Sequence, residues 1–141
     1  MRRKLIGVGI LIASLALFLV VLKDASAGYA FNGYWHLEED GQIYLAGKLT
    51  DTYHTEPDVT AKGHRLYYGD TTDKEYRIGY IRYTATNKAV IIMTFYDEGK
   101  LTYRIRQKQN GSITGTFKGW YRGEDEKIYR VRGDIYGERI R

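Results

Sequence analysis

Residues 100–122 read KLTYRIRQKQNGSITGTFKGWYR, and this stretch decides the fold class. On both sides of Asn110-Gly111, apolar and polar residues alternate with a period of two, which is typical of β-strands with one dry face. An Asn-Gly pair tolerates the positive φ angles that a two-residue turn requires. The stretch therefore predicts a β-hairpin with strands over 100–108 and 112–122.

The strand pattern continues on both sides of this hairpin. Residues 127–136 alternate in the same way, whereas residues 89–96 are apolar on both faces, which predicts the most covered strand, with Ile92 in the core. The pattern over 75–85 changes phase near 79–81, as a β-bulge would produce. No stretch after Leu22 predicts a helix of more than about two turns.

The remaining segments complete a β-rich domain. Turn signals include Asp40-Gly41, and the stretch 52–62 around Pro57, the only proline, lacks a clean period and is expected to be a long loop. Further strands are expected near 33–38, 42–52 and 63–68. We predict an all-β fold, an antiparallel meander of about eight strands that closes into a small barrel or folds into a sandwich.

The first 27 residues predict export of this domain. A positive tip, Met1 to Lys4, precedes 18 residues without a charge, Leu5 to Leu22. A helix of that length spans about 27 Å, close to the thickness of a bilayer core, which favours a retained single-pass anchor with the N-terminus inside. Ala25-Ser-Ala27 also fits a signal-peptidase site, with periplasmic or secreted protein starting at Gly28. Both alternatives place residues 28–141 outside the cytoplasm and make the membrane a partner.

Composition narrows the class of protein further. The 141 residues include no cysteine, which excludes disulfides, thiolate metal sites and an acylated cysteine, and suits a bacterial envelope. Residues 28–99 carry 7 basic and 11 acidic side chains, whereas residues 100–141 carry 11 and 5. Because the exported part as a whole is only weakly basic, nucleic acid is not an expected partner. The basic C-terminal third instead indicates a polar face or an anionic partner.

The basic residues of that third share the polar faces of three consecutive predicted strands. Pairing of these strands would gather them into one patch around a tryptophan, which could hold an anionic glycan or lipid headgroups. The alternative is an ordinary solvent-facing sheet surface. The candidate binding residues are Arg104, Arg106, Lys118, Trp120, Arg122, Arg130 and Arg132.

No catalytic or metal-binding signature is recognisable. Ser112, the only serine after residue 27, adjoins the predicted turn and has no evident base. His54-x-Glu56-x-Asp58 offers one strong zinc ligand locally, whereas zinc sites need three or four. The acidic segments 70–73 and 124–126 lack calcium-loop spacing. We therefore expect no catalytic residue, no metal site and no cofactor.

Gly33-Tyr34-Trp35, at the start of the first strand, resembles the Gly-x-Trp motif of lipocalins and related calycin barrels. The resemblance implies a barrel whose tryptophan packs across the closed end with a basic residue from the last strands, here Arg130 or Arg132. We expect a non-enzymatic bacterial envelope protein, exported or membrane-tethered, that binds a protein partner or small ligand. The alternatives are a calycin-like carrier of a small apolar molecule and a small cell-wall hydrolase with two carboxylates, or a histidine–acid pair, in a cleft.

Overall fold

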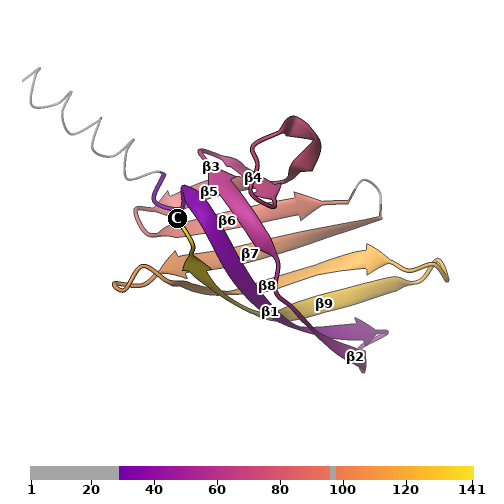
Figure 1. Cartoon of the computed structure of the whole chain (residues 1–141). Helices are drawn as coiled ribbons and strands as arrows, with labels where there is room; N and C mark the ends of the chain where they lie inside the picture. Colours follow the sequence, from indigo (N-terminus) through magenta and orange to yellow (C-terminus); the bar gives the residue numbers. More distant parts are fainter. Residues whose placement is uncertain (1–28, 96–97) are drawn as a thin grey trace, which may run out of the picture.

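The computed structural model describes residues 29–95 and 98–141, which form nine antiparallel strands and one short 3-10 helix, Lys74–Tyr76 (Figure 1). The strands are β1 (Gly33–Leu45), β2 (Lys48–Thr55), β3 (Asp58–Lys62), β4 (Arg65–Tyr68), β5 (Arg77–Ala85), β6 (Lys88–Thr94), β7 (Gly99–Gln107), β8 (Ile113–Arg122) and β9 (Ile128–Arg139). The all-β prediction is confirmed for these residues. The predicted leader over residues 1–27 lies outside them.

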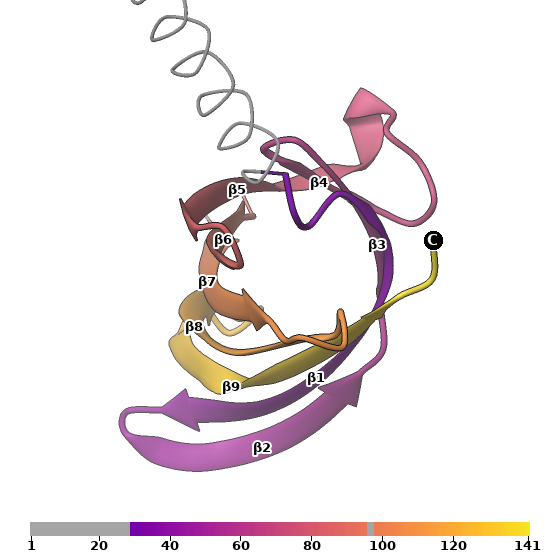
Figure 2. The ribbon, with the colours of Figure 1, turned by 90° about the vertical axis from the view of Figure 1, so that its left-hand side faces the viewer.

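Eight of the strands close into a barrel. Each of β3 to β8 pairs with the next strand, and the long β1 closes the ring by pairing with β3 on one edge and with β9 on the other (Figure 2). The β1–β9 ladder runs from the pair Trp35 and Arg139 to the pair Tyr44 and Arg130. The ninth strand, β2, pairs only with the second half of β1 and lies outside the ring. The fold is therefore the barrel alternative of the prediction, not the sandwich.

Two predicted loops in the N-terminal half are wrong. The strand β1 continues through Asp40-Gly41. The glycine leaves space for a neighbouring side chain instead of forming a turn: a Cβ atom at Gly41 would lie 2.2 Å from the Tyr53 ring. The β1–β2 turn is instead Ala46-Gly47, with φ angles of 50° and 81°. The predicted loop over 52–62 contains the end of β2 and all of β3. Pro57 interrupts the ladder only locally, since it has no N–H to donate.

The hairpin between β7 and β8 is confirmed, but its turn is longer than predicted. Residues 108–112 connect the strands, and the Lys108 N–H donates to the Ser112 carbonyl over 2.8 Å. Within this turn only Gly111 has a positive φ, of 87°. The Asn110 side-chain oxygen accepts hydrogen bonds from the Ser112 N–H (3.0 Å) and hydroxyl (2.7 Å). Ser112 is therefore accounted for as a turn residue.

Alternation correctly predicts which side chains of the last three strands face the interior. The buried set includes Tyr103, Ile105, Ile113, Phe117, Val131 and Ile135. In β6, however, Ile91 points into the core and Ile92 lies on the outer face between Tyr80 and Thr102, so the placement of Ile92 in the core is wrong. Period-two alternation still holds in this strand. The outer face is apolar there as well, and the buried Val90 lies between Arg82 and Arg104.

Glycines allow the wall formed by β7, β8, β9 and β1 to curl tightly. A Cβ atom at Gly119 or Gly133 would lie 2.0 Å from the carbonyl oxygen of Lys100 or Asp40, respectively. Such contacts are impossible for any other residue without moving the backbone of the neighbouring strand. The predicted bulge is also present: the β4–β5 register shifts at Ile78, one residue before the expected position. Within the residues that the structure describes, no helix has the length and apolar character to cross a membrane.

Candidate ligand-binding sites

One end of the barrel is sealed around Trp35. This side chain is 2% exposed, its indole N–H donates to the Phe31 carbonyl over 2.8 Å, and the Phe31 ring stacks on Tyr83. The guanidinium of Arg139 lies 4.8 Å from the Trp35 ring centroid and donates to the Ala30 carbonyl. The expected pairing of the tryptophan with a basic residue of the last strand is present, but the partner is Arg139, because Arg130 and Arg132 face outward elsewhere on β9.

The opposite end of the interior holds an apolar cavity of about 310 Å³. Side chains from β1 to β7 and β9 form its wall, among them Leu37, Ile78, Ile91, Met93, Leu101 and Ile135. Two aromatic residues of its lining, Tyr68 and Phe95, are 57% and 41% exposed, so they form part of its rim. A volume of this size is at the lower end of the range for small-molecule sites.

A small polar group interrupts this apolar wall. The Glu39 carboxyl lies among Tyr53, Thr55 and Tyr103 in the cavity lining. Burial raises the pKa of Glu39, although hydrogen bonds with Tyr103 and Thr55 act in the opposite direction. Burial also raises the pKa of Tyr53 to about 12, and that of Tyr103 rises for the same reason. The cavity therefore combines a large apolar surface with one acceptor that a buried donor could satisfy.

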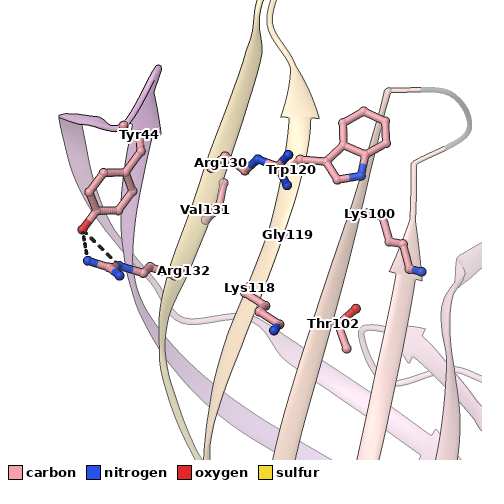
Figure 3. Close-up of a pocket in the computed structure, with 10 residues that line it drawn as sticks. Tyr44, Lys100, Thr102, Lys118, Gly119, Trp120, Arg130, Val131 and Arg132 are labelled. Atoms are coloured by element: carbon pink, nitrogen blue, oxygen red, sulfur yellow. Dashed lines mark hydrogen bonds between the residues drawn. The ribbon is translucent and has the colours of Figure 1, made fainter.

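The predicted basic strip forms one surface on the outside of the barrel. Strand register places Lys118 beside Arg132, Trp120 beside Arg130, and Arg104 beside Thr116. A shallow groove of about 710 Å³ runs over β7, β8 and β9 (Figure 3). Its lining includes Tyr44, Lys100, Thr102, Lys118, Trp120, Arg130 and Arg132. We call this set the basic groove.

One of the groove cations, Arg132, is held in place by Tyr44. The Arg132 guanidinium donates to the Tyr44 hydroxyl over 2.8 and 3.1 Å and lies 4.7 Å from the Tyr44 ring centroid (Figure 3). Among the described residues, no carboxylate forms an ion pair with Lys100, Lys118, Arg130 or Arg132. Within the part of the chain that the structure describes, the groove is therefore a positively charged surface without ion-paired carboxylates and with two aromatic side chains.

The structure brings most of the seven predicted residues together. Four line the basic groove, and Arg104 lines a smaller neighbouring depression with Thr102 and Lys118. Arg106 lies further along β7, opposite Lys88, and Arg122 forms an ion pair with Glu126 at 3.8 Å. The prediction did not include Lys100 and Tyr44. Lys100 lies on the same polar face of β7 as Arg104, so the alternation pattern could have predicted it. Tyr44 lies beside the groove only because β1 pairs with β9, which the sequence pattern does not reveal.

The acidic residues considered as catalytic or metal-binding groups lie in different parts of the structure. Asp70 forms an ion pair with Arg141, and Asp125 bonds the Tyr129 hydroxyl in the β8–β9 turn. Glu39 is the only acidic residue described in the lining of the cavity, and the basic groove has none. Neither concave site therefore offers the two carboxylates that glycoside hydrolysis requires.

A histidine–carboxylate cluster occupies the outer surface of β1, β2 and β3. His36 Nδ1 lies 2.7 Å from Asp58, and His54 Nδ1 lies 2.7 Å from Asp40. The hydrogen bond to Asp58 raises the pKa of His36, and that to Asp40 raises the pKa of His54. The ligand atoms of His36, Glu38 and Glu56 lie within 4.8 Å of one another.

No protein-family model matches the chain, and the search of curated proteins finds no match. Among solved structures, the chain is similar to one described as the monomer form of the M. tuberculosis PknI sensor domain. The TM-score is 0.45 and the sequence identity is 8%, over 77% of this chain and 86% of that chain. A similarity of this degree carries no argument about the ligand or role of this chain.

Proposed function

We propose that this chain is an exported, non-catalytic binding protein whose barrel holds a small apolar ligand with one hydrogen-bond donor. The observation that carries the proposal is the apolar cavity of about 310 Å³ at the end of the barrel opposite Trp35. Its wall is apolar, its rim is aromatic, and Glu39 is the acidic group inside it. Export is supported by the sequence of residues 1–27, with its positive tip and apolar run.

The polar group inside the cavity defines the ligand further. The Glu39 carboxyl bonds Tyr103 and Thr55, and its remaining lone pairs could accept one further hydrogen bond, from a hydroxyl or amine of the ligand. The hydrocarbon part of the ligand would contact Ile91, Met93 and Leu101. Ligands that are fully ionic are disfavoured, because the cavity supplies too few partners for them.

Titration with N-phenyl-1-naphthylamine, an apolar fluorophore with one N–H, tests this function. We expect saturable binding with one site per chain and a blue-shifted emission. Leu101→Trp should abolish binding because the larger ring fills the cavity. Leu49→Trp is the matched control, since Leu49 is 55% exposed on β2 and does not line the cavity. Equal binding by both variants would show that the probe occupies another place.

The basic groove supports a second binding role, for an anionic polymer or lipid headgroups. The observation that favours it is the set of exposed cations around Trp120 without described carboxylate partners. Such a surface attracts polyanions over a Debye length and orients them by stacking. Both sites can operate in one molecule because the groove lies outside the wall and the cavity inside it.

A further inference from the structure

Two five-residue segments of the chain share the pattern His-x-Glu-x-Asp. They are His36-Leu-Glu-Glu-Asp40 on β1 and His54-Thr-Glu-Pro-Asp58, which spans the β2–β3 junction. The segments are antiparallel neighbours, because the ladders pair His36 with Asp58 and Asp40 with His54. Each histidine therefore faces the aspartate of the other segment, and the two glutamates lie between these pairs.

The aspartates determine which ring nitrogen of each histidine is available. His36 Nδ1 and His54 Nδ1 each lie 2.7 Å from an aspartate oxygen, Oδ1 of Asp58 and of Asp40, respectively. An ionised carboxylate only accepts hydrogen bonds, so both Nδ1 atoms donate. In a neutral ring the lone pair is then on Nε2. A carboxylate that fixes a histidine in this way is the usual outer partner of a metal-binding imidazole.

Both free nitrogens are directed toward the same glutamate. His36 Nε2 lies 3.6 Å from Glu56 Oε1, and His54 Nε2 lies 3.9 Å from Glu56 Oε2. Glu38 completes the group, since its carboxylate is within 4.8 Å of the ligand atoms of His36 and Glu56. Two nitrogens and two carboxylates therefore converge on one position, which either a proton on each Nε2 or a single cation between the four groups stabilises.

We propose that these paired segments bind one divalent transition-metal ion, of which Zn²⁺ is the best fit, through His36, His54, Glu38 and Glu56. Zinc bonds to nitrogen and oxygen of about 2.0–2.2 Å place tetrahedral ligand atoms about 3.4 Å apart. The ligand atoms of His36, Glu38 and Glu56 lie within 4.8 Å of one another, and side-chain rotations would bring them to this value; His54 Nε2, 3.9 Å from Glu56 Oε2, needs a larger rotation to join them. These rotations are available because His36, His54 and Glu56 are 40%, 50% and 52% exposed.

The donor set selects the class of metal. Imidazole with carboxylate suits Zn²⁺, Ni²⁺ and Cu²⁺, whereas Ca²⁺ and Mg²⁺ prefer oxygen ligands alone. The ion would join β1 to the β2–β3 junction across Pro57, where the ladder is interrupted. Thr55 and Pro57 also line the cavity, so the metal would fix part of the cavity wall.

The test uses the tag-free full-length chain in detergent, stripped with a chelator and titrated with ZnCl₂ in a calorimeter. We expect saturation at one ion per chain and an increase in melting temperature. Substitution with Co²⁺ should give the intense visible absorption of a tetrahedral site. The double variant His36→Ala, His54→Ala should lose binding, whereas His64→Ala, which removes the third histidine outside the cluster, should keep it. Asp58→Asn should weaken binding by about 10- to 100-fold.

Several results would overturn the proposal: an absence of saturable binding, unchanged affinity in the double variant, or equal loss in His64→Ala. Far-UV circular dichroism checks that each variant is folded. If the double variant is unfolded, Glu56→Gln replaces it, since Glu56 is half exposed and lies between strands. Retained affinity in Glu56→Gln would contradict the assigned ligand set, and a loss of affinity would support it.

Discussion

Adjacent isoleucines in β6 provide a sharp test of the barrel. Ile91 belongs to the buried core and lines the cavity, whereas Ile92 is only partly buried on the outer face. Their residue types are identical and their backbones are equally hydrogen-bonded in the same two ladders. Replacing each in turn by aspartate therefore changes one variable, the face on which the charge is placed.

The expected loss of unfolding free energy follows from the burial of each side chain. At Ile91 the substitution removes about three buried apolar carbons, each worth roughly 0.8 kcal/mol. It also leaves a carboxyl without partners inside the barrel, at a cost of about 1–3 kcal/mol. The total destabilisation is about 4–5 kcal/mol, comparable with the whole stability of a small domain. At Ile92 the carboxyl stays in water, and the cost is about 1 kcal/mol from the lost partial burial.

Thermal unfolding followed by circular dichroism measures the difference. At roughly 4 °C per kcal/mol for a domain of this size, Ile91→Asp should lower the melting temperature by about 15–20 °C and Ile92→Asp by about 4 °C. Equal losses, or a larger loss for Ile92→Asp, would refute the assignment of inner and outer faces, and with it the closed barrel.

Four further predictions concern packing, pH dependence, anion binding and export. Gly133→Ala should destabilise the domain by about 3 kcal/mol in urea titrations, because the new Cβ would meet the Asp40 carbonyl oxygen at 2.0 Å. Glu39 has a folded-state pKa raised above 4.5, so its contribution to stability is complete below the unfolded pKa and is lost as pH rises through the folded value. The melting temperature of the parent should accordingly fall relative to that of Glu39→Gln as pH rises through the folded-state pKa of Glu39; parallel profiles of the two proteins would contradict this. The variant Arg104→Glu, Arg130→Glu should fold normally but elute from heparin and release anionic vesicles at clearly lower salt, and unchanged retention would exclude anion binding at the basic groove and at the adjoining depression that Arg104 lines. Cell fractionation with mass spectrometry of the N-terminus should find the chain in the envelope, beginning at Met1 or Gly28, and a cytosolic chain would contradict export.

The sequence predicted the features that depend on local patterns. Alternation in residues 100–136 correctly separates Tyr103, Phe117 and Val131 from the outward arginines, because side chains on a strand alternate strictly between its two faces. The hairpin at Asn110-Gly111 was also correct, although tertiary context selected a longer turn. Alternation also places four of the seven candidate residues on the outer face of β8 and β9, where they line the basic groove.

The features that the sequence did not reveal depend on strand closure. Gly41 has the pattern of a turn but serves as space for the Tyr53 ring, which comes from another strand. Glu39 enters the cavity only because β1 continues through that position. The segment 54–58 has too few ligands by itself, and its counterpart at 36–40 becomes relevant only when β1 pairs with both β2 and β3. In each case the deciding neighbour is distant in sequence.

The position of a bound probe tests the central claim most directly. Nuclear Overhauser contacts between N-phenyl-1-naphthylamine and methyl groups of the chain would locate it. We predict contacts to the methyl groups of Ile91 and Leu101, which line the cavity. Contacts to Ile92 or Leu49 on the outside, without any to Ile91 and Leu101, would contradict a ligand-binding interior.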